Sequence, residues 1–221
     1  MIKAVLFDLD GTLLNRDQSL ERFARRQYSR FHTLRAKLTE SHYVERFMKL
    51  DEKGYVPKEL VYASLAEEFN ITETLTEELI HDYFDVFHQS CIAFPKLTCM
   101  LNTLKNQGYQ LGIITNGRDP FQMQNIRALE IEHYFDVILI SEKEGLKKPD
   151  PRIFHRALNR INVMAEESVF VGDHPEKDIQ AALSVGMHSV LKKDDYWSAD
   201  SIEHVISELD EIPDIIKKLC S

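Results

Sequence analysis

The chain begins with MIKAVLFDLDGTLL, residues 1–14. A near-continuous apolar run extends from Ile2 to Phe7 and stops at Asp8, and the turn-forming Gly11 follows shortly after it. A short apolar run without polar alternation is typical of a strand that is covered on both faces. We therefore predict a central parallel strand that ends at Asp8.

Similar apolar runs recur later in the chain, and each stops at a polar or turn-forming residue. They cover residues 111–114, 137–140, 169–171 and 190–191. The segments between them repeat apolar residues at helical spacing, as at 97–104 and 154–161. This alternation of strand and helix predicts an α/β fold with a doubly wound parallel sheet.

Residues 15–92 interrupt the alternation, because they contain no strand-like run and their apolar residues recur at helical spacing. Thr74 and Glu77 have the spacing of a capping box that opens the last helix of this stretch. We predict an α-helical domain at 15–92, inserted over the carboxyl end of a sheet domain formed by 1–14 and 93–221. Its aromatic residues at helical spacing are expected to form a bundle core: Phe23, Phe31, Tyr83, Phe84 and Phe87.

The composition is that of a globular protein and disfavours several kinds of partner. The 221 residues are 43% hydrophobic and 29% charged, as in globular proteins. Lys plus Arg 27 and Asp plus Glu 36 give 27 − 36 = −9, which disfavours nucleic acid and anionic membranes as partners. No apolar run reaches the roughly 18 residues of a membrane span, and two aspartates precede any signal-peptide core. We expect a cytoplasmic protein, and the sequence does not indicate an oligomeric state.

Acidic residues follow two of the predicted strands. Asp8 and Asp10 end the first strand, and Asp173 and Asp178 come after the run at 169–171. A solvated turn would account for Asp8 and Asp10 taken alone. Open α/β sheets, however, bind ligands at the carboxyl ends of their strands, and four carboxylates at that edge repel one another strongly. Because oxygen ligands favour Mg²⁺ over zinc or copper, we predict a magnesium site.

Neutral donors and a lysine accompany these acids. Thr115, Asn116 and Gly117 follow the second strand and offer a hydroxyl, an amide and unhindered backbone N–H groups, which suit a phosphoryl oxygen. Lys148 could balance the negative charge, and Lys147 beside it could do so instead. Each of these residues, taken alone, would be an ordinary surface or strand-end residue.

Four segments together resemble a known family. They are FDLDGTL at 7–13, IITNG at 113–117, KPDPRIF at 148–154 and VGDHPEKDI at 171–179. In this order, and each after a predicted strand, they resemble the four motifs of the haloacid dehalogenase (HAD) superfamily. Their spacing is similar to that of its phosphatase branch with a helical cap inserted between the first and second motifs (subfamily IA, C1 cap).

The resemblance implies a role for each motif residue. Asp8 would be the nucleophile that forms an aspartyl-phosphate, and Asp10 would be the general acid and base. The phosphoryl group would be held by a set of donors: Thr115, the backbone of Asn116 and Gly117, and Lys148. Mg²⁺ would be bound by Asp8, the main-chain carbonyl of Asp10 and Asp173, with Asp178 completing or orienting this shell.

The resemblance also implies an activity. The dehalogenases of the family need no acid for the leaving group, and its phosphonate-cleaving branch usually lacks the second aspartate, so Asp10 favours phosphate monoesters. We expect a Mg²⁺-dependent phosphomonoester hydrolase for a small phosphorylated metabolite, such as a mononucleotide, a phosphosugar or phosphoglycolate. A phosphosugar mutase and a catalytically silent metal-binding module are the alternatives.

Overall fold

The computed structural model describes residues 1–194, 196–199 and 201–219. The chain divides into two compact units, which are described separately below. The sheet unit consists of Met1–Asn15 and Ala93–Ser221, and the helical unit consists of Arg16–Ile92. Among the helices of the described residues, none combines the length and the apolar character needed to cross a membrane.

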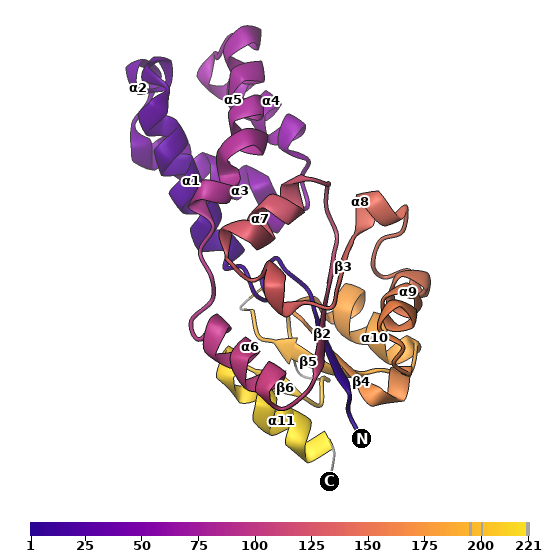
Figure 1. Ribbon diagram of the computed structural model, residues 1–221. Helices are drawn as coiled ribbons and strands as arrows, with labels where there is room; N and C mark the ends of the chain where they lie inside the picture. Colours follow the sequence, from indigo (N-terminus) through magenta and orange to yellow (C-terminus); the bar gives the residue numbers. More distant parts are fainter. Residues whose placement is uncertain (195, 200, 220–221) are drawn as a thin grey trace. The chain divides into compact units, whose positions relative to one another are not determined.

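The sheet unit is built on six parallel strands within the described residues (Figure 1). The strands lie in the order β3-β2-β1-β4-β5-β6. Their bounds are β1 Ala4–Phe7, β2 Gln110–Thr115, β3 Val137–Ile140, β4 Ser168–Gly172, β5 His188–Lys192 and β6 Val205–Ile206. The predicted doubly wound α/β sheet is confirmed. The two-residue β6 was not predicted, because so short a run has no detectable periodicity.

The first strand lies at the centre of the sheet, and all four of its residues are fully buried. Phe7 at its carboxyl end is paired with Ile113 of β2 on one side and with Val171 of β4 on the other. Because all three strands run in the same direction, the residues that follow them meet at one edge of the sheet.

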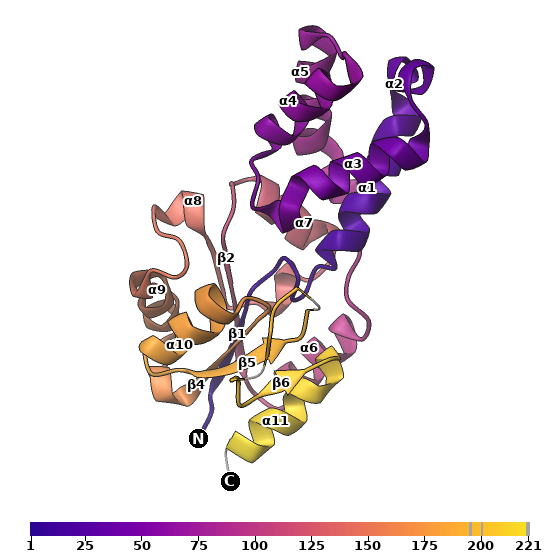
Figure 2. The same cartoon turned by 180° about the vertical axis from the view of Figure 1, so that it is seen from behind.

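Helices cover both faces of this sheet (Figures 1 and 2). On one face α9 and α10 pack on the strands through a buried cluster in which the rings of Phe154 and Phe170 lie 5.1 Å apart. On the other face α6 packs against α11. The helices of this unit are α6 Leu97–Asn106, α7 Phe121–Ala128, η3 Glu132–Tyr134, α8 Ser141–Glu144, α9 Pro151–Ile161, η4 Ala165–Glu167, η5 Pro175–Gln180, α10 Ala181–Ser184, η6 Leu209–Glu211 and α11 Ile212–Leu219.

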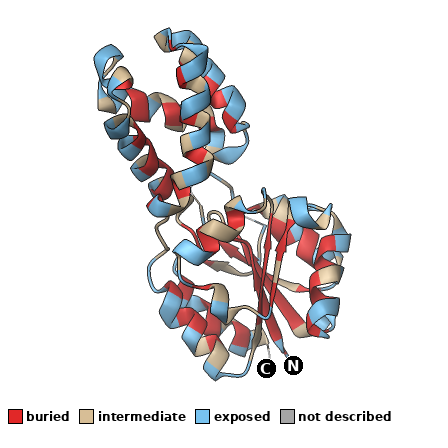
Figure 3. Ribbon diagram, turned by 45° about the horizontal axis from the view of Figure 1, so that its top comes forward, coloured by how far each residue is buried: buried red, intermediate tan, exposed pale blue. Residues whose placement is uncertain are grey.

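The helical unit contains α1 Arg16–Arg30, α2 His32–Lys37, α3 Glu40–Asp51, η1 Glu52–Gly54, α4 Lys58–Phe69, α5 Glu73–Val86 and η2 Phe87–Ser90. Each of its longer helices buries one face and exposes the other (Figure 3). Of the aromatic residues predicted to form its core, Phe23, Tyr83 and Phe87 are buried, whereas Phe31 and Phe84 are only partly so.

The start of α5 differs from the prediction. Thr72, not Thr74, is the N-cap residue, and its Oγ1 accepts a hydrogen bond from the backbone N–H of Leu75. A helix that begins at Glu73 places Leu75, Leu79 and Tyr83 at four-residue intervals on one buried face. A helix that began after Thr74 would keep these three residues on the same face, so the apolar pattern alone does not distinguish the two threonines.

A buried glutamine joins four helices of this unit. The Gln27 Nε2 of α1 donates to Leu79 O and to Asp82 Oδ2, both at 2.9 Å in α5. Its Oε1 accepts from the hydroxyl of Tyr43 at 2.6 Å and from that of Tyr62 at 2.7 Å, in α3 and α4. Both donors and both lone pairs of the amide are thus used inside the bundle.

We expect Gln27→Leu to lower the free energy of unfolding by about 2–5 kcal/mol, because it leaves two buried tyrosine hydroxyls without their acceptor. Urea unfolding followed by circular dichroism measures this change. The matched control is Gln89→Leu at an exposed position of the same unit, which should change stability by less than about 0.5 kcal/mol. Equal effects of the two substitutions would show that the amide network does not stabilise the bundle.

Candidate active site

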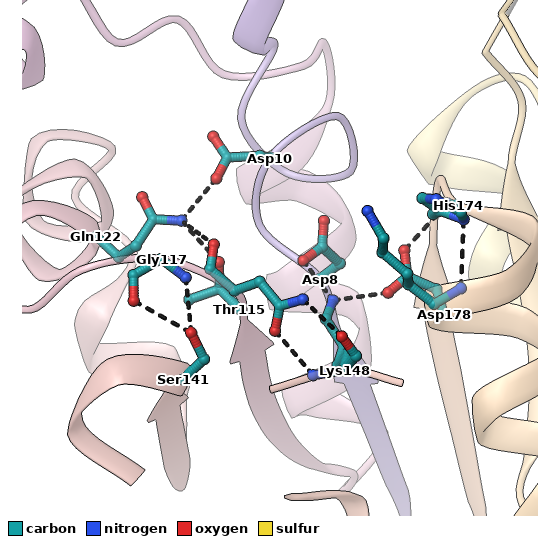
Figure 4. Close-up of polar contacts among 11 residues, drawn as sticks. Asp8, Asp10, Thr115, Gly117, Gln122, Ser141, Lys148, His174 and Asp178 are labelled. Atoms are coloured by element: carbon teal, nitrogen blue, oxygen red, sulfur yellow. Dashed lines mark hydrogen bonds and ion pairs between the residues drawn. The ribbon is translucent and has the colours of Figure 1, made fainter. Parts of the chain in front are cut away.

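Residues from four segments of the sheet unit meet at the carboxyl edge of the sheet (Figure 4). Asp8 directly follows β1, and its backbone N–H donates to Val171 O of β4 at 2.9 Å. Thr115 is the last residue of β2, and Asp173 directly follows β4. Lys148 reaches the same edge from the loop that precedes α9, so the strand order brings together residues that are far apart in sequence.

Three carboxylates form a cluster at this edge. Asp8, Asp173 and Asp178 each place one carboxylate oxygen within 4.8 Å of the others. Asp8 and Asp178 are buried, and Asp173 is partly so. The side chain of Asp10 does not belong to this cluster, since it is directed toward Gln122 (Figure 4).

Two glycines make room for the cluster. Gly11 adopts a φ of +83°, a conformation that side chains disfavour, and a Cβ atom at this position would overlap the carboxylate of Asp173. A Cβ atom at Gly172 would overlap the side chain of Asp178. The acidic side chains can approach one another because the backbone next to them carries no side chain.

Lys148 partly balances this charge. Its buried Nζ lies 2.6 Å from Asp8 Oδ1 and 2.6 Å from Asp178 Oδ1. Although burial lowers the pKa of Lys148, the attraction of Asp178 and Asp8 raises it above its ordinary value. Lys147, the alternative considered from the sequence, is exposed.

One ammonium group does not neutralise three carboxylates. Burial raises the pKa of Asp8 to about 7, and the repulsion of Asp178 and Asp10 adds to this while Lys148 opposes it. Burial and the charges of Asp8 and Asp178 also raise the pKa of Asp173 well above its ordinary value. A divalent cation with oxygen ligands would remove this excess of negative charge, so the residues present fit Mg²⁺.

Asn116 and Gly117, which follow β2, make hydrogen bonds with other residues of the site. Asn116 Nδ2 donates to Lys148 O, and the Lys148 backbone N–H donates to Asn116 Oδ1, both at 2.9 Å. The Gly117 N–H donates to Ser141 Oγ at 2.9 Å. Ser141 at the start of α8 thus accepts from this N–H in the present structure, and the binding of a phosphoryl oxygen by Gly117 stays a prediction.

Some residues of the site were not found by sequence reasoning. Gln122 contacts both Asp10 and Thr115, and Ser141 fixes Gly117. No motif distinguishes a glutamine in the first turn of a helix from a surface residue, so no signal in one sequence identifies Gln122.

His174 lies next to Asp173 and caps η5. Its Nδ1 accepts from the backbone N–H groups of Glu176 and Lys177. This agrees with a structural role for His174 at the start of that helix.

A buried carboxylate, a paired lysine and a carboxylate cluster that could hold a cation converge at this edge, which is where enzymes with a doubly wound fold carry their active sites. Comparison with known proteins identifies its family. The family model "Haloacid dehalogenase-like hydrolase" matches residues 5–192. The chain belongs to this family, which confirms the resemblance inferred from the four motifs.

Individual relatives agree with this membership. The chain is 33% identical over 196 residues to a glyceraldehyde 3-phosphate phosphatase of Pyrococcus abyssi, covering 87% of this chain and 82% of the relative. It is 31% identical to the glyceraldehyde 3-phosphate phosphatase of Methanocaldococcus jannaschii over 99% of both chains. A crystal structure of a HAD phosphatase from Thermococcus onnurineus matches with a TM-score of 0.70 at 27% identity, covering 97% of this chain and 98% of the other.

Protons and a divalent cation compete for the carboxylate cluster, so Mg²⁺ should raise the melting temperature more at about pH 8 than at about pH 5.5. Without metal, folded Asp8 keeps its proton up to a pKa of about 7, well above its ordinary value of 3.8. Stability without metal therefore falls as the pH rises between these two values, because the folded state binds more protons than the unfolded one. Thermal unfolding with EDTA or MgCl₂ at both pH values measures the difference.

Asp173→Asn should weaken Mg²⁺ binding in this experiment by at least about tenfold, as the loss of groups in or around a metal site commonly does. Asp214→Asn, an exposed position on α11, should leave the response unchanged. A stabilisation by Mg²⁺ that is equal at the two pH values, or that survives Asp173→Asn, would place the metal elsewhere.

Proposed function

We propose that the chain is a Mg²⁺-dependent phosphatase that hydrolyses a small phosphorylated metabolite through an aspartyl-phosphate on Asp8. The observation that carries this proposal is the position of Asp8. Its carboxylate is paired with Lys148 at 2.6 Å and lies in one cluster with Asp173 and Asp178. The relatives named above, which are phosphatases, support a phosphoric monoester hydrolase.

The residues that would hold Mg²⁺ are Asp8 and Asp173, with the main-chain carbonyl of Asp10. Asp178 would orient this shell, because its Oδ1 accepts from Lys148 and its Oδ2 from the backbone N–H of His174 at 3.0 Å. When bound, the ion would screen the repulsion between a carboxylate nucleophile and an anionic phosphoryl group.

In the first half of the reaction a bond forms between an oxygen of Asp8 and phosphorus while the bond from phosphorus to the leaving oxygen breaks. Asp10 gives its proton to that leaving oxygen. In the second half Asp10 takes a proton from water as the water oxygen bonds to phosphorus and the bond to Asp8 breaks. Lys148 and Thr115 would bind the phosphoryl oxygens in both halves, and the backbone N–H of Asn116 would add a third donor.

The helical unit begins at Arg16, after β1 and the loop that carries Asp8 and Asp10, and it ends shortly before α6. We propose that it is the cap domain at 15–92 and that the substrate is selected by cap residues and by the loop after Asp10. Small phosphorylated metabolites, including nucleotides and sugar phosphates, are the substrate class. The net charge of −9 supports a small-molecule substrate over nucleic acid or an anionic membrane as a partner, and we propose a cytoplasmic enzyme.

Turnover of nucleotides, phosphosugars and phosphoglycolate with and without Mg²⁺ tests this function. A phosphatase releases inorganic phosphate and depends on Mg²⁺. Transfer of the phosphoryl group to a sugar hydroxyl would instead identify a phosphosugar mutase. Stabilisation by Mg²⁺ without turnover of any monoester would identify a silent metal-binding module.

Asp8→Asn should lower kcat on p-nitrophenyl phosphate by at least about 10³-fold, because it removes the nucleophile of the covalent route. The matched control Asp214→Asn should stay within about twofold of the unmodified enzyme. Folding of both variants is checked by thermal unfolding, and Asp8→Asn should unfold cooperatively because it removes one charge from a crowded acidic cluster. Full activity of Asp8→Asn would exclude an aspartyl-phosphate at this residue.

A further inference from the structure

Gln122 occupies the space between two residues of the proposed reaction. It lies in the first turn of α7 and is 2% exposed. Its Nε2 donates to Asp10 Oδ2 at 2.6 Å and to Thr115 Oγ1 at 2.7 Å (Figure 4). A longer contact of 3.4 Å joins the same nitrogen to Asn116 O. One amide nitrogen therefore faces three oxygen atoms of the site.

The orientation of this amide is determined by its neighbours. The three oxygen atoms that face Nε2 require a donor, and Asn125 Nδ2 donates to Gln122 Oε1 at 3.1 Å from the other side. An amide turned by 180° would place its oxygen against the carboxylate of Asp10. The buried Asn125 thus fixes which end of Gln122 points into the site.

The absence of a side chain at Gly117 provides the room for Gln122. A Cβ atom at position 117 would lie 2.6 Å from Cγ and 2.9 Å from Cδ of Gln122. Gly117 does not have a positive φ, so its backbone conformation does not itself require glycine. Gln122 and Gly117 fit together as a pair, which indicates that the position of Gln122 is built into the site.

The contact to Asp10 leaves one carboxylate oxygen available. Oδ2 accepts from Gln122, whereas Oδ1 accepts no hydrogen bond from the part of the chain that the structure describes. The oxygen that can carry and transfer a proton is therefore Oδ1. By holding Oδ2, Gln122 sets the direction in which Oδ1 points.

The contact to Thr115 has a similar effect on its hydroxyl. Because Oγ1 accepts from Gln122, the hydrogen of this hydroxyl must point to another acceptor. No acceptor for it occurs among residues 1–194, 196–199 and 201–219. The hydroxyl is thus oriented to donate to a phosphoryl oxygen.

We infer that Gln122 is a positioning residue that orients Asp10 and Thr115 for proton transfer and phosphoryl binding. This inference rests on the proposed phosphatase function. Gln122 transfers no proton itself. It directs Asp10 Oδ1, whose proton passes to the leaving oxygen as the phosphorus–oxygen bond breaks and which later receives a proton from the attacking water.

Substrates with different leaving groups test this role. A nitrophenolate leaves without a proton near neutral pH, whereas the alkoxide of an alkyl phosphate such as glyceraldehyde 3-phosphate needs one. In Gln122→Met, kcat for the alkyl phosphate should fall by about 10- to 100-fold, a part of the usual contribution of general acid–base catalysis. With saturating p-nitrophenyl phosphate, the first equivalent of nitrophenolate should be released at a rate within about threefold of normal, because Lys148 and the Asn116 N–H still bind the phosphoryl group when the Thr115 hydroxyl is no longer oriented. Slow hydrolysis should follow, because Asp10 must still activate water.

Gln124→Met is the matched control. Gln124 lies on the same helix and makes no side-chain hydrogen bond within the described residues, so both substrates should react at the normal rate. In Gln122→Met, a fall in the rate of the first nitrophenolate release as large as the fall in kcat for the alkyl phosphate would indicate a merely structural role and would overturn the inference. Unchanged rates for both would overturn it as well.

Gln122→Glu provides an independent test if Gln122→Met does not fold. A protonated glutamic acid can donate to Asp10 or Thr115, whereas its ionised form cannot. The activity of Gln122→Glu relative to the unmodified enzyme should therefore rise as the pH falls below about 6, and a constant ratio would contradict the inference. Asp8→Asn separates the two proposals. If this variant remains active, the proposed function fails. If it is inactive but the Gln122 variants do not behave as expected, only the positioning role of Gln122 is rejected.

Discussion

The repulsion among Asp8, Asp173 and Asp178 is the constraint on which the architecture of the sheet unit depends. Their oxygens lie within 4.8 Å of one another beside a single buried ammonium group. The parallel strands supply the framework that holds these charges together, and Gly11 and Gly172 supply the space. The protein thus uses the stability of a fully buried central strand to maintain a local charge arrangement that is unfavourable without a cation.

Much of this arrangement could be predicted from the sequence, because each of the strands β1 to β5 contains a short apolar run whose end is marked by a polar or turn-forming residue. Parallel pairing then brings Asp8, Asp173 and Thr115 to one edge. The pattern of apolar residues does not reveal which polar side chain pairs with which backbone group. Thr72 rather than Thr74 caps α5, and the Gly117 N–H donates to Ser141.

Buried glutamines show most clearly what the sequence pattern does not reveal. Gln27 and Gln122 each lie on a helix at a position where a polar residue usually faces solvent. Both are buried, and both use their amide to join oxygen or nitrogen atoms of other segments. A side chain with two donors and two lone pairs can satisfy several buried polar groups at once. Its partners come from distant parts of the chain, so they become visible only in the folded structure.

The paired hydrogen bonds between Asn116 and the backbone of Lys148 fix the position of this lysine. The side-chain amide of Asn116 pairs with the backbone of Lys148 as the peptide group of a neighbouring strand would. These bonds hold the lysine at the end of β2. Ser141 fastens the other end of the same connection to Gly117. Asn116 thus influences the charge balance of the site indirectly, because it holds the backbone of the residue whose ammonium group lies between Asp8 and Asp178.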